Sequence, residues 1–250
     1  MNYEDKTRER LALALDFDDL VEALSLARQV KEFFSVAKVG LELFSASGPD
    51  AIEAFLELDY RVFCDLKLYD IPNTVHKAAR VIGGLGASYL TVHASGGQEV
   101  MQAAGEGFLA GAQAGGFENP VLLGVTVLTS DSDHAHSTVV DRARLALISG
   151  CAGVVCSGDD VLVVAQEILN NSGVQNADPR KNFDIVVPGI RLDGDSPGDQ
   201  KRVVTPERAL RDGATLLVVG RSVTSADDPK GAARKVFEAA TLGVISPKPL

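Results

Sequence analysis

Apolar and polar residues alternate in blocks along the whole chain. Eight short runs rich in β-branched and other apolar residues recur at a steady interval: Leu11–Asp16, Val36–Leu41, Arg61–Leu66, Ser88–His93, Val121–Thr126, Gly153–Cys156, Asp184–Pro188 and Thr215–Val219. The segments between these runs carry apolar residues at helical spacing, as in Leu20, Ala23, Leu24 and Ala27. A strand followed by a helix, repeated along the chain, predicts a parallel sheet.

The placement of polar residues favours a closed barrel over an open doubly wound sheet. Polar or charged residues end nearly every run: Asp16, Lys38, Asp65, Lys67, His93, Ser157, Arg191 and Arg221. A barrel brings the carboxyl ends of all its strands to one face, where such residues would form a single site. The length of 250 residues also suits one barrel. We therefore predict an α/β fold, a single (β/α)8 barrel that forms one domain over residues 1–250.

The first run shows how the side chains of such a barrel would divide. Ala12, Ala14 and Asp16 share one face of the strand, and Leu11, Leu13 and Leu15 share the other. We expect the small residues to face the barrel axis and the leucines to face the helices.

Charge and hydropathy exclude several classes of partner. The chain has 34 acidic and 24 basic residues, a net charge of −10, whereas a nucleic-acid surface needs a basic footprint. No apolar run approaches the ~18 residues that a membrane-spanning helix requires, and the first ten residues, MNYEDKTRER, are charged. We expect a cytoplasmic protein that binds neither nucleic acid nor membrane.

The cysteines and histidines predict no metal site. The three cysteines lie in apolar segments without C-x-x-C spacing, which favours reduced structural thiols: Cys64, Cys151 and Cys156. His134 and His136 have the spacing of a metal pair but no third ligand nearby, so a solvated loop is the better interpretation. His93 is expected to be a packed, hydrogen-bonded residue.

The densest group of charged residues lies between Asp65 and Thr74. Asp65 and Lys67 are two apart on a strand, so their side chains should point the same way from bases ~7 Å apart. With Lys38 on the neighbouring strand and Asp70 beyond, the charges alternate in sign. Flanking carboxylates favour the charged form of an amine, which makes Lys67 a candidate proton donor. A purely structural network of ion pairs is the alternative, but the position at the strand ends favours a catalytic one.

A second group lies at the ends of the last two predicted strands. Pro188–Arg191 and Val218–Ser222 occupy the places where this fold repeatedly binds phosphate. Gly220 would let backbone N–H groups approach an anion, and Arg221 offers a planar fork of donors. Leu192–Gln200, a polar stretch with two glycines, is predicted to be a lid.

Taken together, these motifs resemble the orotidine 5'-phosphate decarboxylase family along the whole chain. The residues that carry the resemblance are Leu15-Asp16, Lys38-Val39-Gly40, Asp65 to Thr74, Val92-His93-Ala94, Leu128-Thr129-Ser130, Pro188 to Arg191, Gln200 and Val219 to Ser222. The D-x-K-x-x-D-I-P core is highly specific. The resemblance implies conversion of orotidine 5'-monophosphate to UMP and carbon dioxide, the last step of de novo pyrimidine biosynthesis, without a metal or other cofactor.

The resemblance also assigns roles to residues. Lys67 would protonate C6 as carbon dioxide leaves, Asp65 would sit against the departing carboxylate, and Lys38 and Asp16 would hold the ribose hydroxyls. The resemblance implies a homodimer in which three residues reach into the partner's site, namely Asp70, Ile71 and Thr74. It further implies pyrimidine contacts from Thr129 and Ser130 and phosphate contacts from Gln200, Gly220, Arg221 and Arg191.

Two other functions remain open at this point. A magnesium-dependent sugar-phosphate decarboxylase of the same superfamily shares the D-x-K-x-x-D core, whereas Ile71-Pro72 and Gln200 suit the nucleotide enzyme. A catalytically inactive, nucleotide-binding barrel is the second alternative. A binding module has no need for a proton donor between carboxylates, so intact Lys38, Asp65, Lys67 and Asp70 speak against it.

Overall fold

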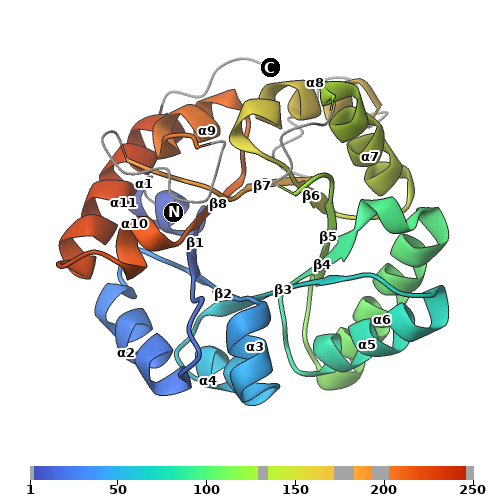
Figure 1. Ribbon diagram of the computed structural model, residues 1–250, viewed down its shortest axis with the longest axis horizontal. Coiled ribbons are helices and arrows are strands. Elements are labelled where there is room, and N and C mark those ends of the chain that lie inside the picture. The colour runs from blue at the N-terminus through green and yellow to red at the C-terminus, as the bar shows by residue number, and fades with distance from the viewer. Residues whose placement is uncertain (1–2, 129–134, 172–182, 193–202, 246–250) are drawn as a thin grey trace.

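Eight parallel strands close into a barrel in the order in which they occur along the chain. The computed structural model describes residues 3–128, 135–171, 183–192 and 203–245. The strands are β1 (Leu11–Ala14), β2 (Val36–Val39), β3 (Arg61–Leu68), β4 (Tyr89–His93), β5 (Val121–Val125), β6 (Gly153–Val155), β7 (Asp184–Val187) and β8 (Leu216–Val219). Figure 1 looks into the ring of strands, with the helices around it. The (β/α)8 barrel is as predicted, and all eight strands lie where they were predicted, with ends that differ by one or two residues.

Helices cover the outside of the barrel, and they come between successive strands and after β8 (Figure 1). They are α2 (Leu20–Val30), α3 (Leu41–Ser47), α4 (Asp50–Leu56), α5 (Pro72–Gly84), α6 (Gln98–Gly115), α7 (His136–Ile148), α8 (Val161–Asn171), α9 (Pro206–Asp212), α10 (Arg221–Thr224) and α11 (Pro229–Ile245). Two short 3₁₀ turns follow β4 and β6, at Ala94–Gly96 and Gly158–Asp160. Among the described residues, no helix is both long and apolar enough to cross a bilayer.

Closure of the barrel pairs its first strand with its last. β1 pairs with β2 on one side and with β8 on the other, where Ala12 lies opposite Val218. β1 ends at Ala14, whose partner is Lys38, so Asp16 lies beyond the last paired residue and not on the strand as predicted. β3 runs two residues further than predicted, to Leu68.

The core has two layers separated by the strands. The barrel interior is filled by Ala12, Ala14, Val36, Phe63, Tyr89, Leu123, Val186, Leu216 and Val218. Leu11, Leu13 and Leu15 belong to the larger layer between strands and helices. The division predicted for the first strand is confirmed, although other strands place large residues such as Phe63 and Tyr89 inside.

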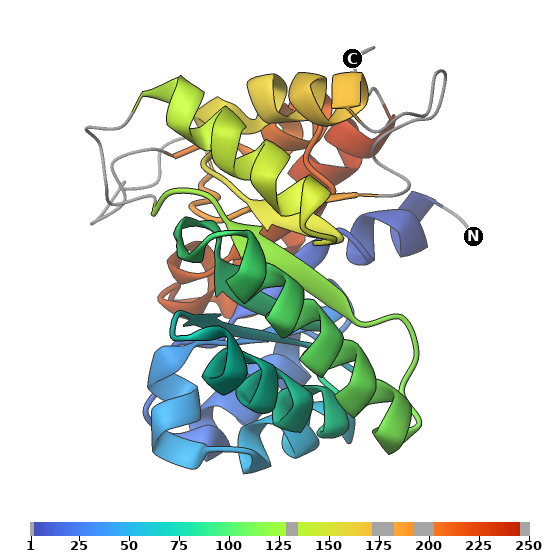
Figure 2. The same ribbon diagram turned by 90° about the vertical axis from the view of Figure 1, so that its right-hand side faces the viewer.

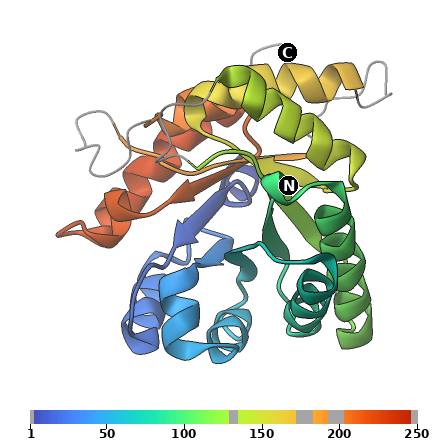
Figure 3. The same ribbon diagram turned by 45° about the vertical axis from the view of Figure 1, so that its right-hand side comes forward.

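Helices α5 and α6 lie side by side along the barrel (Figure 3). Glycines on α6 allow this close approach, because a Cβ atom at Gly107 or Gly111 would collide with the carbonyl oxygen of His76 or Arg80 on α5. The packing fixes α5, and with it the segment that leads from β3 into this helix.

The amino-terminal helix α1 (Tyr3–Arg8) lies at one end of the barrel, as the turned view in Figure 2 shows. A cavity of about 560 Å³ lies between this helix and the starts of the strands, with Arg61, Tyr89, Asp184 and Thr215 in its wall. The Thr215 hydroxyl donates to Asp184 Oδ1 over 2.8 Å. Polar groups at this end of a barrel usually serve stability.

Candidate active site at the carboxyl ends of the strands

A cavity of about 700 Å³ opens at the other end of the barrel. Its wall is built from the ends of seven strands and the residues after them: Asp16, Lys38, Gly40, Asp65, Lys67, Val125, Val127, Val155, Pro188, Gly189, Arg191, Gly220 and Arg221. Six of the eight polar strand-end residues named from the sequence therefore gather in a single pocket, whereas His93 and Ser157 do not line it.

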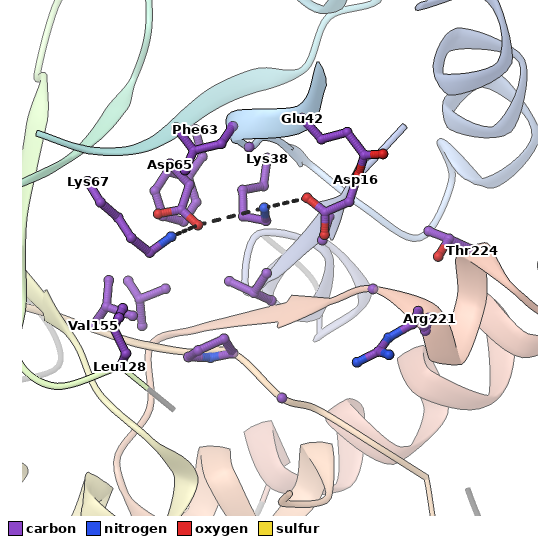
Figure 4. A pocket seen from close by; sticks show the side chains of 18 of the residues that line it. Asp16, Lys38, Glu42, Phe63, Asp65, Lys67, Leu128, Val155, Arg221 and Thr224 are labelled. Carbon is purple, nitrogen blue, oxygen red and sulfur yellow. Dashed lines mark hydrogen bonds and ion pairs between the residues drawn. The ribbon is translucent and has the colours of Figure 1, made fainter. Parts of the chain in front are cut away.

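Four charged side chains form a row along one wall of this pocket (Figure 4). Lys38 Nζ lies 3.0 Å from Asp16 Oδ1 and 3.7 Å from Asp65 Oδ2. Lys67 Nζ lies 2.8 Å from the same Asp65 oxygen. The charges alternate in sign along the row, so each lysine has a carboxylate beside it and Asp65 has an ammonium group on each side.

Burial and charge act in opposite directions on Asp65. Its side chain is 15% exposed and that of Lys38 only 9%, and burial alone would raise the pKa of the Asp65 carboxyl. The ammonium groups of Lys38 and Lys67 and two hydrogen bonds outweigh the burial, so the pKa of Asp65 lies below its ordinary value. Asp65 is therefore a carboxylate at neutral pH, and it presents fixed negative charge beside Lys67.

An irregular stretch of β3 places Asp65 and Lys67. Cys64 pairs with Leu90 and Leu68 with Val92, so three residues of β3 lie opposite one residue of β4. Lys67 has a left-handed backbone, with φ of 49°, which is uncommon for a residue with a side chain. The side chains nevertheless alternate as predicted: Asp65 and Lys67 both line the pocket, whereas Cys64, Leu66 and Leu68 pack in the outer layer. The bulge changes the pairing with β4 and not the direction in which these side chains point.

Gly40 supports the row from the end of β2. A Cβ atom at this position would lie 2.8 Å from Asp16 Oδ1 and 2.9 Å from Lys38 Nζ. Its φ of −89° is accessible to any residue, so glycine is needed here for space and not for backbone freedom. Sequence reasoning quoted this glycine only as part of a motif.

The ends of β7 and β8 form the opposite wall. Figure 4 shows Arg221 across the pocket from the charged row, with its guanidinium pointing into the space between. Arg191 is buried, and its Nη1 donates to the Ile190 carbonyl over 2.8 Å. Ser222 Oγ donates to the same carbonyl and joins the two strand ends. Among the residues that the structure describes, a Cβ atom at Gly220 would meet only Ala14, at 3.5 Å, so these residues leave space around the glycine.

The sequence is similar to known proteins along nearly its whole length. The model of the orotidine 5'-phosphate decarboxylase / HUMPS family matches residues 9–236. The chain belongs to this family. An orotidine 5'-phosphate decarboxylase of Maridesulfovibrio salexigens is 42% identical over 235 residues, which cover 90% of this chain and 96% of the relative. One of Anaeromyxobacter dehalogenans is 42% identical over 241 residues, covering 92% and 98%.

A solved structure shows the same barrel. The crystal structure of orotidine 5'-phosphate decarboxylase from Lactobacillus acidophilus matches with a TM-score of 0.75 and 35% identity, over 93% of this chain and 99% of that one. The fold and the family are thus the ones that the sequence motifs indicate.

Three site residues that the resemblance to the orotidine 5'-phosphate decarboxylase family implied lie away from the pocket of their own chain. Asp70, Ile71 and Thr74 are exposed and do not line it. Ile71 is 66% exposed and its neighbour Tyr69 63%, and the Ile71 N–H donates to Asp70 Oδ1. Within one chain the alternating row therefore ends at Asp16 on one side and Lys67 on the other, and Asp70 is separate from it.

Three other implied contacts fall outside the described residues: Thr129, Ser130 and Gln200. The predicted lid also lies there, apart from Leu192 at its start. Their roles in this member of the family stay predictions.

His93 and His136 contact other side chains, and the three cysteines are buried. His93 lies against the ring of Tyr69, and burial, together with the positive charge of Lys67, lowers its pKa. His136 begins α7 rather than lying in a loop, and its Nδ1 is 2.6 Å from Asp160 Oδ1. His134 falls outside the described residues. The cysteines are free and buried as predicted, and burial raises the pKa of both Cys64 and Cys151 to about 12.

Thr91 is the residue that sequence reasoning missed. It lies in the middle of β4, is fully buried, and contacts both Asp65 and Lys67. Within Leu-Thr-Val-His, Thr91 is an ordinary residue for a strand. Its contacts with Asp65 and Lys67 lie at the bulge in β3, which the sequence did not predict.

Proposed function

We propose that this chain converts orotidine 5'-monophosphate to UMP and carbon dioxide, the last step of de novo pyrimidine biosynthesis. The observation that carries the proposal is the row from Asp16 to Lys67, in which an ammonium group lies beside a fixed carboxylate in the barrel pocket. The relatives that share the family and nearly the full length of the chain carry the name of this activity.

Lys67 supplies the proton in this proposal. As the bond between C6 and the carboxyl carbon breaks, its electron pair stays on C6 and takes a proton from the Lys67 ammonium. Asp65 faces the departing carboxylate of the substrate. The repulsion between these two negative charges disappears once neutral carbon dioxide has formed. Fixed charges that need no rearrangement during the reaction are an effective source of rate enhancement, and no metal or other cofactor enters the proposed step.

The remaining groups of the substrate hold it in place. Asp16 and Lys38 bind the ribose hydroxyls, and Thr129 and Ser130 contact the pyrimidine. The phosphate is held by Gln200, Gly220, Arg221 and Arg191. The free energy of binding the phosphate can be used to distort the substrate at C6, the reacting carbon. Figure 4 shows Arg221 across the pocket from Lys67, so phosphate binding and proton transfer would occur on opposite walls.

We further propose a homodimer that completes each site. Asp70, Ile71 and Thr74 would enter the pocket of the partner subunit and place a second carboxylate beside Lys67. Exposed apolar side chains next to Asp70, on Tyr69 and Ile71, support an interface in this region.

The last part of the proposal concerns domain organisation and cellular compartment. We propose that residues 1–250 work as one barrel domain in the cytoplasm. Three buried, unpaired cysteines suit a reducing compartment.

The deciding experiment follows the ultraviolet absorbance of orotidine 5'-monophosphate mixed with purified protein and EDTA. Loss of the conjugated carboxylate should lower the absorbance without any metal, and the Lys67→Ala variant should give a flat trace. A flat trace from the folded wild-type protein would contradict the proposal. Activity on a sugar phosphate that requires magnesium would then support the second enzyme, and nucleotide binding without turnover would support an inactive barrel.

A further inference from the structure

The bulge in β3 leaves backbone groups without ladder partners at the centre of the site. Between the pairs Cys64–Leu90 and Leu68–Val92, residues 65–67 lie opposite Thr91 alone. A buried backbone N–H that finds no partner costs free energy. The Lys67 N–H finds its partner in a side chain, because it donates to Thr91 Oγ1 over 2.8 Å.

The same hydroxyl reaches the central carboxylate. Since a backbone N–H can only donate, Thr91 Oγ1 is the acceptor toward Lys67 and its own hydrogen is available for another group. That group is Asp65 Oδ1, 3.1 Å away. The other Asp65 oxygen, Oδ2, faces the ammonium groups of Lys67 and Lys38. The Thr91 hydroxyl thus holds one end of the carboxylate while the lysines hold the other.

Thr91 does not line the pocket and is fully buried, so it has no path to the substrate. From these contacts we infer that Thr91 is a positioning residue for the reaction: it fixes the Asp65 carboxylate and the left-handed Lys67 backbone relative to each other. The inference rests on the proposed function for its kinetic consequences, while the geometry that it predicts is independent of the substrate.

The chain contains a matched control for this contact. At the opposite end of the barrel, Thr215 Oγ1 accepts from the Ile185 N–H over 2.9 Å and donates to Asp184 Oδ1 over 2.8 Å. The two threonines make the same pair of hydrogen bonds to a backbone N–H and a carboxylate. Only Thr91 makes them to residues of the charged row.

The test compares Thr91→Val, Thr91→Ser and Thr215→Val, with kcat, KM, the Kd for UMP and Tm as readouts. For Thr91→Val, kcat should fall roughly 10- to 100-fold, because small misplacements of reacting groups have effects of this size. KM and the Kd for UMP should stay within about threefold, because the substrate does not touch Thr91. Thr91→Ser keeps the hydroxyl and should recover most of kcat. Thr215→Val should lower Tm as much as Thr91→Val but leave kcat unchanged.

Several outcomes would overturn the inference. They are an unchanged kcat in Thr91→Val, a Thr91→Ser variant as slow as Thr91→Val, or an equal loss of kcat in Thr215→Val. If the valine variant does not fold, the same measurements are made on Thr91→Ala, which leaves room for a water molecule. A crystal structure of the variant adds a readout that needs no activity: Asp65 and Lys67 should be displaced, and unchanged positions would refute the positioning role even if the wild type acted on another substrate.

Discussion

The Asp65 carboxylate is held on both of its oxygens. Thr91 donates to Oδ1, and two ammonium groups lie within 3.7 Å of Oδ2. Removing one partner of a buried ion pair leaves an uncompensated charge, which is costly, whereas the complete pair adds little net stability. The row is therefore better explained by what it does to a substrate than by what it adds to folding.

Lys67→Ala should abolish turnover while sparing the binding of UMP-like ligands, because the proposed proton donor is lost and the ribose and phosphate contacts remain. We expect kcat to fall by at least the roughly 10²- to 10⁴-fold that general acids contribute. Steady-state absorbance assays and calorimetric titration with UMP measure the two effects. Lys235→Ala, an exposed lysine on α11, is the control. Near-normal turnover in Lys67→Ala would refute the role.

Gly40→Ala should separate activity from stability. The added methyl group meets the movable ends of Asp16 and Lys38 at 2.8 and 2.9 Å, so the side chains can shift and the free energy of unfolding should change by less than about 1 kcal/mol. Displacement of Asp16 and Lys38, which are proposed to hold the ribose, should lower kcat/KM at least roughly 10-fold. Chemical denaturation and initial-rate kinetics on the same preparation would show this, and a variant with full kcat/KM would contradict it.

Single residues were predictable from the sequence where their chemistry is unusual. Asp65, Lys67 and Lys38 are charged residues at the ends of buried strands, which marks them at once. Neither Thr91 nor Gly40 was assigned a role from the sequence, because a threonine in a strand and a glycine after one are common. The roles of these two residues depend on which atoms surround them. The bulge in β3 determines the neighbours of Thr91, and the pairing of β1 with β2 determines those of Gly40.

At the scale of elements, residues at the carboxyl ends of the strands form the pocket. Seven of the eight strands contribute lining residues, β3 three of them, so no single helix or strand contains the site. The eight strands were predictable because their apolar runs are short and evenly spaced. Their ends were less so: β1 stops before Asp16, and the bulge carries β3 on to Leu68, because pairing with the neighbouring strand, and not composition, decides where a strand ends.

The Arg221→Ala variant tests whether the ends of β7 and β8 bind the phosphate of the substrate. A charge-assisted hydrogen bond contributes about 1.5–3 kcal/mol, so we expect KM for the phosphorylated substrate to rise roughly 10- to 100-fold. Activity on the bare nucleoside should hardly change. Arg211→Ala on α9, whose guanidinium pairs with Glu207, is the control. An equal loss on both substrates would show that Arg221 acts on something other than the phosphate.

At the scale of the whole molecule, the two ends of the barrel hold their carboxylates in opposite ways. Asp65 lies between ammonium groups, whereas burial raises the pKa of the Asp184 carboxyl at the other end, despite the hydrogen bond from Thr215. A raised pKa means that the folded state binds the proton more tightly than the unfolded state. Ionised Asp184 therefore lowers stability at neutral pH, and this penalty disappears below the ordinary aspartate pKa of about 3.9.

Asp184→Asn should accordingly raise Tm at pH 7, by roughly 2–4 °C for each kcal/mol gained. The gain should shrink as the pH falls toward about 4, because the wild-type carboxyl then takes up its proton. Calorimetric unfolding of both proteins over this pH range measures the difference. A lower Tm at pH 7 would mean that attraction from Arg61 and Arg10 outweighs the burial. Activity should be unchanged.

Mixing two inactive variants tests the proposed homodimer. Lys67→Ala and Asp70→Ala each lose a group from every site of their own dimers. If Asp70 serves the partner's pocket, half of the sites in each mixed dimer regain both groups. Random exchange of subunits should restore about a quarter of wild-type activity. The same mixture without subunit exchange, prepared from cross-linked dimers, should stay inactive. No recovery after exchange would place both groups in the same chain's site.

The closure of β1 on β8 has a consequence for how the protein is made. β1 emerges from the ribosome before the other strands of the barrel, whereas its partner β8 emerges after all of them. During most of synthesis, the nascent sheet has unpaired edges that can attract other chains. The helices that leave the ribosome between strands can shield its faces, yet only the arrival of residues 216–219 removes the last edge. A ribosome that stalls before this point would release a chain prone to aggregate, although that chain would already contain Asp16, Lys38, Asp65 and Lys67.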